Sequence, residues 1–236
     1  MTERPVDLSL PPLIPAQWKA ITGVDRFKLE QRYIDSLRPS FLRQFGPGEH
    51  ERHGGVRAAP LACYPRHLLC EIGLRIRGEA MVGAFLFGAE GAIPIDGTSM
   101  PLHDLNERIG QAIASADAAI AYTLVFGSAV HGGDGRFHVL GSADDLAPYN
   151  RGDTAPFQAL VQPPAARAEG EDWVVDAAAR YGRTLFRTRF RIQRSGLIEM
   201  IDDEPLGVET ACGPDRFQWL ARGAPVCPPP AMPEGD

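Results

Sequence analysis

The stretch TLFRTRFRIQRSGLIEMID, residues 184–202, limits the possible folds more than any other part of the chain. Apolar residues and arginines alternate in its first half, and successive side chains of a β-strand point to opposite faces. The triplet Arg194-Ser195-Gly196 suits a three-residue hairpin loop, because glycine accepts the positive φ that closes such a loop. We therefore predict an antiparallel hairpin over these residues.

The apolar pattern of the two arms fixes the register of this hairpin. A shift by one residue would place either Phe190 or Ile192 opposite Glu199, so a single pairing keeps the apolar side chains together. That pairing sets Ile192 opposite Ile198 and Phe190 opposite Met200. The face that we expect to be buried carries Phe186, Phe190, Ile192, Ile198 and Met200.

The other face of the hairpin carries Arg187, Arg189 and Arg191, which are our candidates for binding a small anionic ligand. The alternative is that the return strand neutralises them. Arg191 lies opposite Glu199 in the expected register, and the acids of the segment IDDEP follow along the same strand. Cross-strand ion pairs stabilise a hairpin by about 0.2–1 kcal/mol each. We favour this structural interpretation, because a groove for nucleic acid is not normally lined with carboxylates.

The charge of the chain argues against nucleic acid and anionic membranes as partners. The formal net charge is -6, and the sequence pI is about 5.5. Affinity for phosphates depends on clustered lysine and arginine. No segment reaches the roughly 20 apolar residues that a membrane span needs. We expect a protein partner, no nucleic acid and no membrane.

The order of the expected elements predicts an α+β fold, because runs of helices and runs of strands are separated along the chain. We expect N-terminal helices, a β-hairpin, a central helical pair and a C-terminal antiparallel β-meander. These elements are expected at residues 16–41, 70–88, 100–130 and 157–202, respectively. The β-prone letters AYTLVF leave a strand open as an alternative for residues 117–130.

The domain organisation follows from proline and glycine. Residues 1–14 are proline-rich and predict an extended N-terminal arm, and residues 15–222 predict a single α+β domain. Within this domain, the glycine-rich segment at about residues 45–60 is typical of a flexible loop. The proline-rich residues 223–236 predict a disordered tail.

The four cysteines, Cys63, Cys70, Cys212 and Cys227, do not indicate a disulfide framework in a chain of this length. The N-terminal residues lack the apolar run of a secretory signal, so we expect a cytoplasmic protein whose cysteines remain thiols. The segment CYPRHLLC has Cys-x3-His-x2-Cys spacing, but structural zinc sites usually need a second pair of ligands. We expect neither a metal nor a cofactor.

Two polar segments contain the weak candidates for a catalytic site. The segment IDGTSMPLHDLN brings Asp96, His103 and Asp104 to the start of a helix, where anions bind readily. The segment HGGDGRFH places His138 after a glycine-rich turn. Both also have a structural interpretation, in which Asp96 makes a turn and Ser99 caps the helix. Neither contains a nucleotide-binding or nucleophile motif.

These observations favour an accessory or binding protein that contacts a protein partner. One alternative is a small enzyme with acid–base chemistry near Asp96, His103 and the turn at residues 131–138. The other is an anionic-ligand binder that uses the arginine face. An enzyme should show a pocket in which His103 or His138 approaches an acid, whereas a binding module should expose apolar side chains.

Overall fold

The computed structural model describes residues 10–14, 50–218 and 220–229, and it describes side chains in the second range from Val56 onward. The predicted helices at residues 16–41 and the start of the predicted loop at residues 45–49 lie outside the described residues. The rest is an α+β fold in which every described strand pairing is antiparallel. Among the described helices, none is long and apolar enough to cross a membrane.

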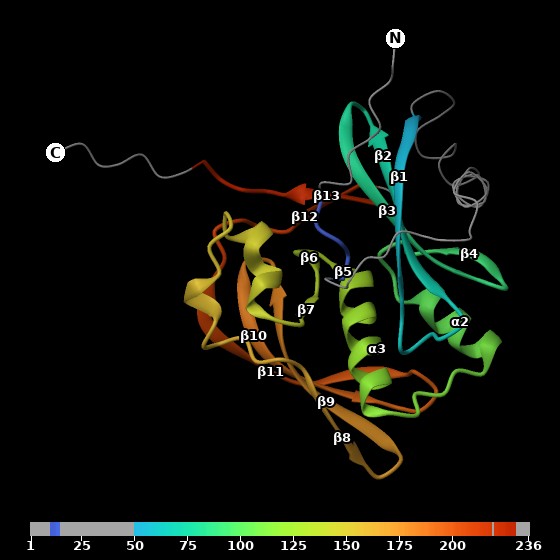
Figure 1. The fold of residues 1–236 in the computed structure, drawn as a ribbon. Coiled ribbons are helices and arrows are strands. Elements are labelled where there is room, and N and C mark those ends of the chain that lie inside the picture. The colour runs from blue at the N-terminus through green and yellow to red at the C-terminus, as the bar shows by residue number, and fades with distance from the viewer. Residues whose placement is uncertain (1–9, 15–49, 219, 230–236) are drawn as a thin grey trace.

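The first sheet is built around the predicted hairpin and has the strand order β1-β2-β3-β13-β12, with β4 also paired to β3. Its strands are β1 (His50–Pro60), β2 (Leu68–Ile76), β3 (Glu79–Gly88), β4 (Gly91–Pro94), β12 (Asp215–Gln218) and β13 (Ala221–Pro225). The tight β2–β3 turn contains Arg77 and Gly78, both with positive φ. Strands from both ends of the chain therefore lie in one sheet (Figure 1).

Two boundaries differ from the predictions in this sheet. Residues 50–60 form strand β1 instead of a flexible loop, with register shifts between Glu51 and His53 and between Gly54 and Val56. These irregularities let the glycine-rich segment pair with β2 although it lacks regular alternation. The tail does not begin at residue 223, because β13 continues to Pro225 and pairs with β12.

The second sheet contains the predicted meander and has the order β11-β10-β9-β7, with β8 also paired to β9. Its strands are β7 (His138–Leu140), β8 (Ala165–Glu169), β9 (Asp172–Tyr181), β10 (Thr184–Ile192) and β11 (Ile198–Glu209). The meander was predicted to begin at residue 157, but the described residues 157–162 (FQALVQ) form no strand. Instead, a short 3-10 helix, Ala155–Phe157, is followed by a turn in which the Val161 amide donates to the Phe157 carbonyl.

The predicted hairpin register is confirmed between Phe190 and the turn, and it shifts by one residue between Arg189 and Phe190. Ile192 pairs with Ile198, Phe190 with Met200, and Arg191 lies opposite its predicted partner Glu199. Phe190 is 5% exposed, but Met200 is 43% exposed, so the expectation that Met200 is buried was wrong. β11 is an edge strand of its sheet, and its outer side therefore remains in contact with solvent.

The central helical pair consists of α2 (Met100–Ile109) and α3 (Ala116–Ala129). Ser115 caps α3 by accepting a hydrogen bond from the Ala118 amide, which decides for a helix over a strand in this segment. Ser99 precedes α2 but makes no capping hydrogen bond with its side chain. α3 lies against β7, β8 and β9 in the middle of the molecule (Figure 1).

The main core lies where the two sheets and the two helices meet. It combines Leu69 and Leu86 of the first sheet with Val175 and Phe190 of the second sheet, and Tyr122 of α3. A smaller core covers part of the second sheet with the 3-10 helix Ala143–Tyr149 and with Phe157. One end of this sheet is therefore covered on both faces, and Leu185 of β10 is buried in the smaller core.

Candidate functional site

A surface hollow of about 330 Å³ lies between α2 and the turn of the β10–β11 hairpin. We call it the hairpin hollow, and its lining residues are His103, Asn106, Glu107, Gly110, Gln111, Ser195 and Leu197. Leu197 is 52% exposed at this hollow. The hairpin loop and the helix pair meet here because the Ile113 amide donates to the Arg194 carbonyl at 2.8 Å.

A buried hydrogen-bond chain fixes the floor of the hairpin hollow. Tyr64 donates its hydroxyl to Asn106 Oδ1 at 2.6 Å, and Asn106 Nδ2 donates to the Tyr122 hydroxyl at 3.0 Å. Tyr122 in turn donates to the Gly196 carbonyl at 2.7 Å. Gly196 has φ +83° and lies against Asn106, so a side chain at this position would both strain the backbone and collide with the amide.

The two tyrosine hydroxyls in this series of hydrogen bonds do not exchange protons near neutral pH. Burial is the main cause that raises the pKa of Tyr122 to about 12, and burial also raises the pKa of Tyr64 far above its ordinary value. Both therefore remain protonated donors. Gln111 is also engaged, because its Nε2 donates to the Cys63 carbonyl at 2.6 Å. The floor is thus a rigid and internally satisfied surface.

The structure separates the residues that we proposed for catalysis. His103 lies in the hairpin hollow, and its ring packs in a tilted arrangement against Phe126, with the ring centres 5.7 Å apart. Asp104 instead lines a second hollow of about 420 Å³ with Glu107 and Arg108. Asp96 accepts hydrogen bonds from the amide and hydroxyl of Thr98 and so makes the predicted turn.

His138 is buried elsewhere in the protein. Within the described part of the chain, no hydrogen bond or ion pair joins His103 or His138 to a carboxylate.

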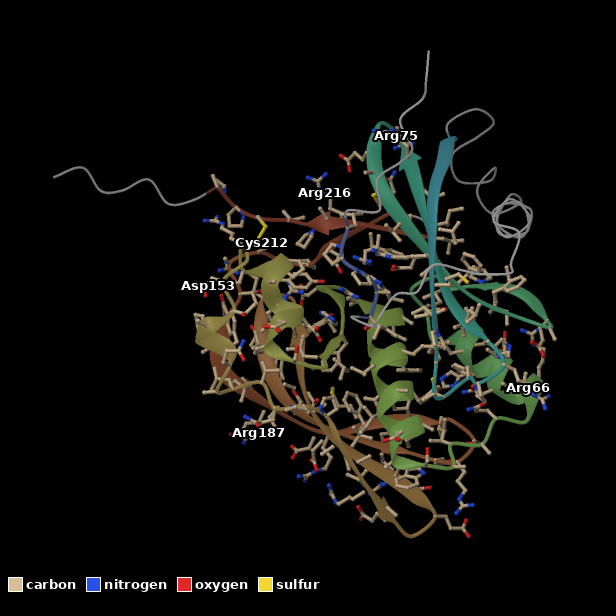
Figure 2. All side chains as sticks on the ribbon, in the orientation of Figure 1. Arg66, Arg75, Asp153, Arg187, Cys212 and Arg216 are labelled. Atoms are coloured by element: carbon tan, nitrogen blue, oxygen red, sulfur yellow. A yellow bond between two sulfur atoms is a disulfide. The ribbon has the colours of Figure 1, made fainter. Side chains whose placement is uncertain are left out.

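The arginine face of the hairpin lies at the outside of the molecule, as Arg187 illustrates (Figure 2). Arg187 pairs with Glu204 at 3.0 Å. Arg189 pairs with Asp176 of β9 at 2.7 Å and lies 3.8 Å from Asp202. These contacts agree with ion pairing inside the sheet, and they occupy two of the three guanidinium groups that we considered for an anionic ligand.

A second group of polar side chains is buried. Its members come from both sheets, from the two-stranded ribbon of β5 (His131–Gly132) and β6 (Gly135–Arg136), and from the 3-10 helix Ala143–Tyr149. We call it the buried charge cluster, and it consists of Glu71, Arg136, Tyr149, Arg180, Asp215 and Arg222. At its centre, Arg136 Nε lies 2.7 Å from Asp215, and both side chains are buried. Tyr149 donates its hydroxyl to Asp215 at 3.0 Å and accepts a hydrogen bond from Arg136. Such a pair persists in a protein interior only when its remaining donors and acceptors are satisfied.

The cluster also holds the N-terminal arm. Arg136 Nη1 donates to the Leu13 carbonyl at 2.7 Å, and the Leu13 amide donates to Glu71 Oε1 at 2.8 Å. Arg222 donates to the Pro11 carbonyl and to Glu71. The side chain of Leu13 joins the main core. Charged groups of three different strands thus fix the main chain of residues 10–14.

Arg180 is the member of the cluster that depends most on carbonyl groups. Its Nη2 donates to the carbonyls of Cys212 and Gly213, and its Nε donates to the Thr210 hydroxyl at 3.2 Å. Its guanidinium lies 3.7 Å from the centre of the Tyr149 ring, in cation–π geometry. Burial lowers the pKa of Arg180 to about 10, so the group stays charged at neutral pH.

Two histidines beside the cluster are neutral. Burial, with repulsion by Arg136 next in importance, lowers the pKa of His131 to about 4. Burial likewise lowers the pKa of His138 well below its ordinary value, and Arg136 and Arg180 add to the effect. Neither ring nitrogen of His138 has a hydrogen-bond partner. These histidines therefore add no positive charge to the interior at neutral pH.

The cysteines fall into two classes. Cys63 and Cys70 are buried thiols, and burial raises the pKa of each to about 12. Cys212 and Cys227 form a disulfide, so the prediction that all four cysteines remain thiols was wrong. His67, between the two free cysteines in sequence, pairs with Glu90 at 2.8 Å. The described residues contain no group of three or more metal-ligand side chains that could hold an ion.

The sequence did not reveal the buried charge cluster for a physical reason. Glu71 occupies a polar position in the alternating sequence of β2, but residues 10–14 contact this side chain and it is buried. Its partner Arg222 is 151 residues away along the chain. The spacing of residues within a short sequence segment cannot indicate a pairing over this separation. In β9 the sequence offers one signal, because Arg180 directly follows the apolar run Ala177–Ala179.

Comparisons of this chain with protein-family models, with curated proteins and with solved structures find no match.

Proposed function

We propose that this protein is a non-catalytic binding protein that contacts a protein partner through the hairpin hollow. The observation that carries the proposal is the exposure of Leu197 at the edge of a hollow whose polar floor is internally satisfied. A partner that covers Leu197 removes its apolar surface from water, so this position offers an anchor for a partner.

The lining of the hollow defines the chemistry of the partner. Glu107 is the one carboxylate among the described residues that line it, and His103 and Ser195 supply further polar groups. An apolar side chain next to a lysine or arginine would complement this surface, because the apolar group would cover Leu197 and the cation would face Glu107. We therefore expect a protein segment that carries an apolar anchor beside a basic residue.

Site-specific crosslinking of the full chain tests this proposal. A photoreactive amino acid replaces Leu197 in cells of the source organism, and a second variant carries it at Val226, an equally exposed apolar position. We expect a discrete adduct with one protein from position 197 and none from position 226. The captured protein is then purified, and its affinity for the unlabelled chain is measured.

The decisive comparison uses substitutions in the full chain. Leu197→Asp should weaken the affinity by at least about tenfold, which corresponds to about 1.4 kcal/mol, because it places a charge where the apolar anchor binds. The matched variant Val226→Asp should leave the affinity unchanged. Equal adducts from both positions, or equal affinity of the two variants, would refute a binding surface at the hairpin hollow.

A further inference from the structure

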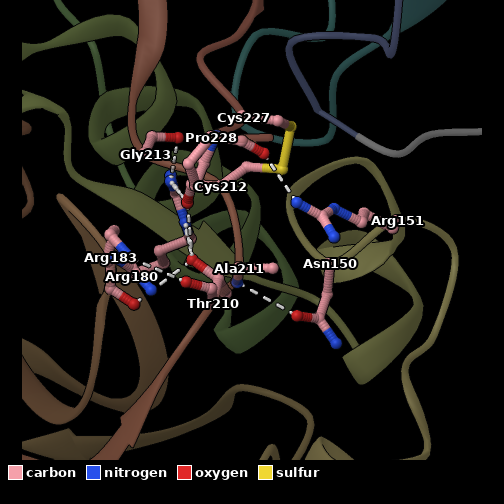
Figure 3. Close-up of a disulfide and its surroundings, with 10 residues drawn as sticks. All are labelled: Asn150, Arg151, Arg180, Arg183, Thr210, Ala211, Cys212, Gly213, Cys227 and Pro228. Atoms are coloured by element: carbon pink, nitrogen blue, oxygen red, sulfur yellow. Dashed lines mark hydrogen bonds between the residues drawn. A yellow bond between two sulfur atoms is a disulfide. The ribbon is translucent and has the colours of Figure 1, made fainter. Parts of the chain in front are cut away.

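The Cys212–Cys227 disulfide joins the C-terminal segment to the backbone around Arg180 (Figure 3). The Gly213 amide donates to the Val226 carbonyl at 2.8 Å, and the Val226 amide donates to the Pro214 carbonyl at 3.1 Å. Arg151 donates to the Pro228 carbonyl at 2.6 Å on the other side of the disulfide. The covalent bond and three hydrogen bonds thus hold residues 226–228 in place.

The same backbone segment forms part of the buried charge cluster. The carbonyls of Cys212 and Gly213 accept hydrogen bonds from Arg180, and the Cys212 amide donates to the Tyr149 carbonyl at 2.8 Å. Asp215, three residues after Cys212, is the central carboxylate of the cluster. Any movement of Cys212 is therefore transmitted to Arg180 and Tyr149.

The two cysteine residues of the disulfide differ in their exposure. Cys212 is fully buried, whereas Cys227 is exposed and lies in the proline-rich C-terminal segment. An exposed disulfide sulfur can be attacked by a soluble thiolate without prior unfolding of the protein. The free thiols Cys63 and Cys70 are both buried, with pKa values that burial raises to about 12, so they do not compete as nucleophiles.

We infer that the Cys212–Cys227 disulfide is a reducible clamp that controls how firmly the C-terminal segment holds the buried charge cluster. The clamp is closed in an oxidising compartment and open in a reducing one. This inference is independent of the binding surface proposed above, because the hairpin hollow contains no residue of the clamp.

Reduction of the clamp needs a dithiol reductant and proceeds in two exchange steps. A thiolate of the reductant attacks Sγ of Cys227, a mixed disulfide forms, and Cys212 leaves as a thiolate that takes up a proton. The second thiol of the reductant loses its proton and attacks the reductant sulfur that is bonded to Cys227. This step releases Cys227 as a thiolate, which takes up a proton. The reductant loses two electrons and becomes a cyclic disulfide, and the protein gains two thiols.

The experiment treats the oxidised full chain with dithiothreitol under native conditions and follows the new thiols by alkylation and mass spectrometry. We expect reduction within about tenfold of the rate in concentrated guanidinium, because the attack does not wait for unfolding. Cys63 and Cys70 should stay unmodified in the native sample and serve as an internal measure of folding. If reduction occurs only at the rate of global unfolding, the disulfide is not reducible in the native protein, which would contradict the clamp.

Hydrogen exchange of the reduced and oxidised chains supplies the second measurement. We expect the amides of Gly213 and Val226 to exchange at least about tenfold faster after reduction, whereas Val175 in the core stays protected. The variant with both Cys212→Ser and Cys227→Ser should show the fast exchange in either condition. Unchanged exchange at Gly213 and Val226 after complete reduction, or absence of the disulfide from the oxidised protein, would overturn the inference.

Discussion

The buried charge cluster and the arginine face of the hairpin use the same kinds of residue with opposite consequences. In the cluster, Arg136 and Asp215 are each 1% exposed in their side chains, whereas Arg187 and Glu204 on the arginine face are 70% and 67% exposed. The two pairs have similar distances, 2.7 Å and 3.0 Å. Water screens the exposed pair but not the buried one. Burial, and not the number or spacing of the arginines, therefore decides which charges this fold depends on.

The largest effect should follow from removal of the central carboxylate of the cluster. Asp215→Ala leaves Arg136 charged and buried without its partner, and it removes the acceptor of the Tyr149 hydroxyl. Loss of one partner of a buried pair typically costs about 3–5 kcal/mol. We expect a loss of this size in the free energy of unfolding, measured by urea denaturation. A loss of less than about 1 kcal/mol would place this pair with the exposed ones.

The second largest effect should come from acid, which lowers the free energy of unfolding through His131 and His138. His131 and His138 stay neutral in the folded protein, since their pKa values lie below the ordinary 6.5, that of His131 at about 4. The unfolded chain takes up these protons as the pH falls below 6.5, so this part of the stability is present above that pH and is lost below it. Each such histidine adds a slope of about 1.4 kcal/mol per pH unit.

The variant His138→Gln isolates this acid effect. It cannot take up the proton, so its free energy of unfolding should fall less steeply between about pH 6 and about pH 4.5 than that of the parent chain. Chemical denaturation at a series of pH values measures both slopes. Identical slopes would mean that His138 is protonated in the folded protein, contrary to its burial among arginines.

A smaller effect is expected where the cluster holds the N-terminal arm. Glu71→Gln keeps the shape of the side chain but removes the charge that Arg57 and Arg222 contact, and it weakens the acceptor for the Leu13 amide. Replacement of a charged acceptor by a neutral one typically costs about 1–3 kcal/mol. We expect a loss of this size, together with faster hydrogen exchange at the Leu13 amide. Unaltered exchange there would show that the arm is held by its apolar side chains alone.

The smallest effect should come from the exposed arginine face. Arg187→Ala removes the pair with Glu204, and exposed pairs contribute about 0–1 kcal/mol. The difference from the parent chain should shrink further as salt is added, because salt screens exposed charges. Unfolding experiments at low and high salt measure it. A loss as large as that of Asp215→Ala would remove the contrast between the two regions.

The parts of the fold that sequence predicted are those set by local patterns. The β10–β11 register follows from alternation and from one glycine at position 196, both within a few residues of the pairs that they determine. The capping of α3 by Ser115 is equally local. Met200 shows the limit, because its exposure depends on β11 being an edge strand, which the hairpin itself does not reveal.

The candidate sites were less predictable, since they depend on distant contacts. Glu71 occupies a polar position in a regular alternation, and its burial results from the arm and from Arg222. Cys227 lies in a segment whose sequence predicts a disordered tail, but the disulfide to Cys212 and hydrogen bonds to distant residues hold this segment in place. His103 was found in a surface hollow, but the loop that forms the other wall is 91 residues further along at Arg194, with Ser195 beside it.

Two double-mutant cycles, one for each region, test the central claim most directly. The first combines Arg136→Met with Asp215→Asn, and the second combines Arg187→Met with Glu204→Gln, with unfolding free energies measured for every variant. We predict a coupling free energy of at least about 2 kcal/mol for the buried pair, because either single change leaves a buried partner unsatisfied. The exposed pair should give about 0.5 kcal/mol or less. Equal coupling in the two cycles would contradict the claim that burial decides which charges hold this protein together.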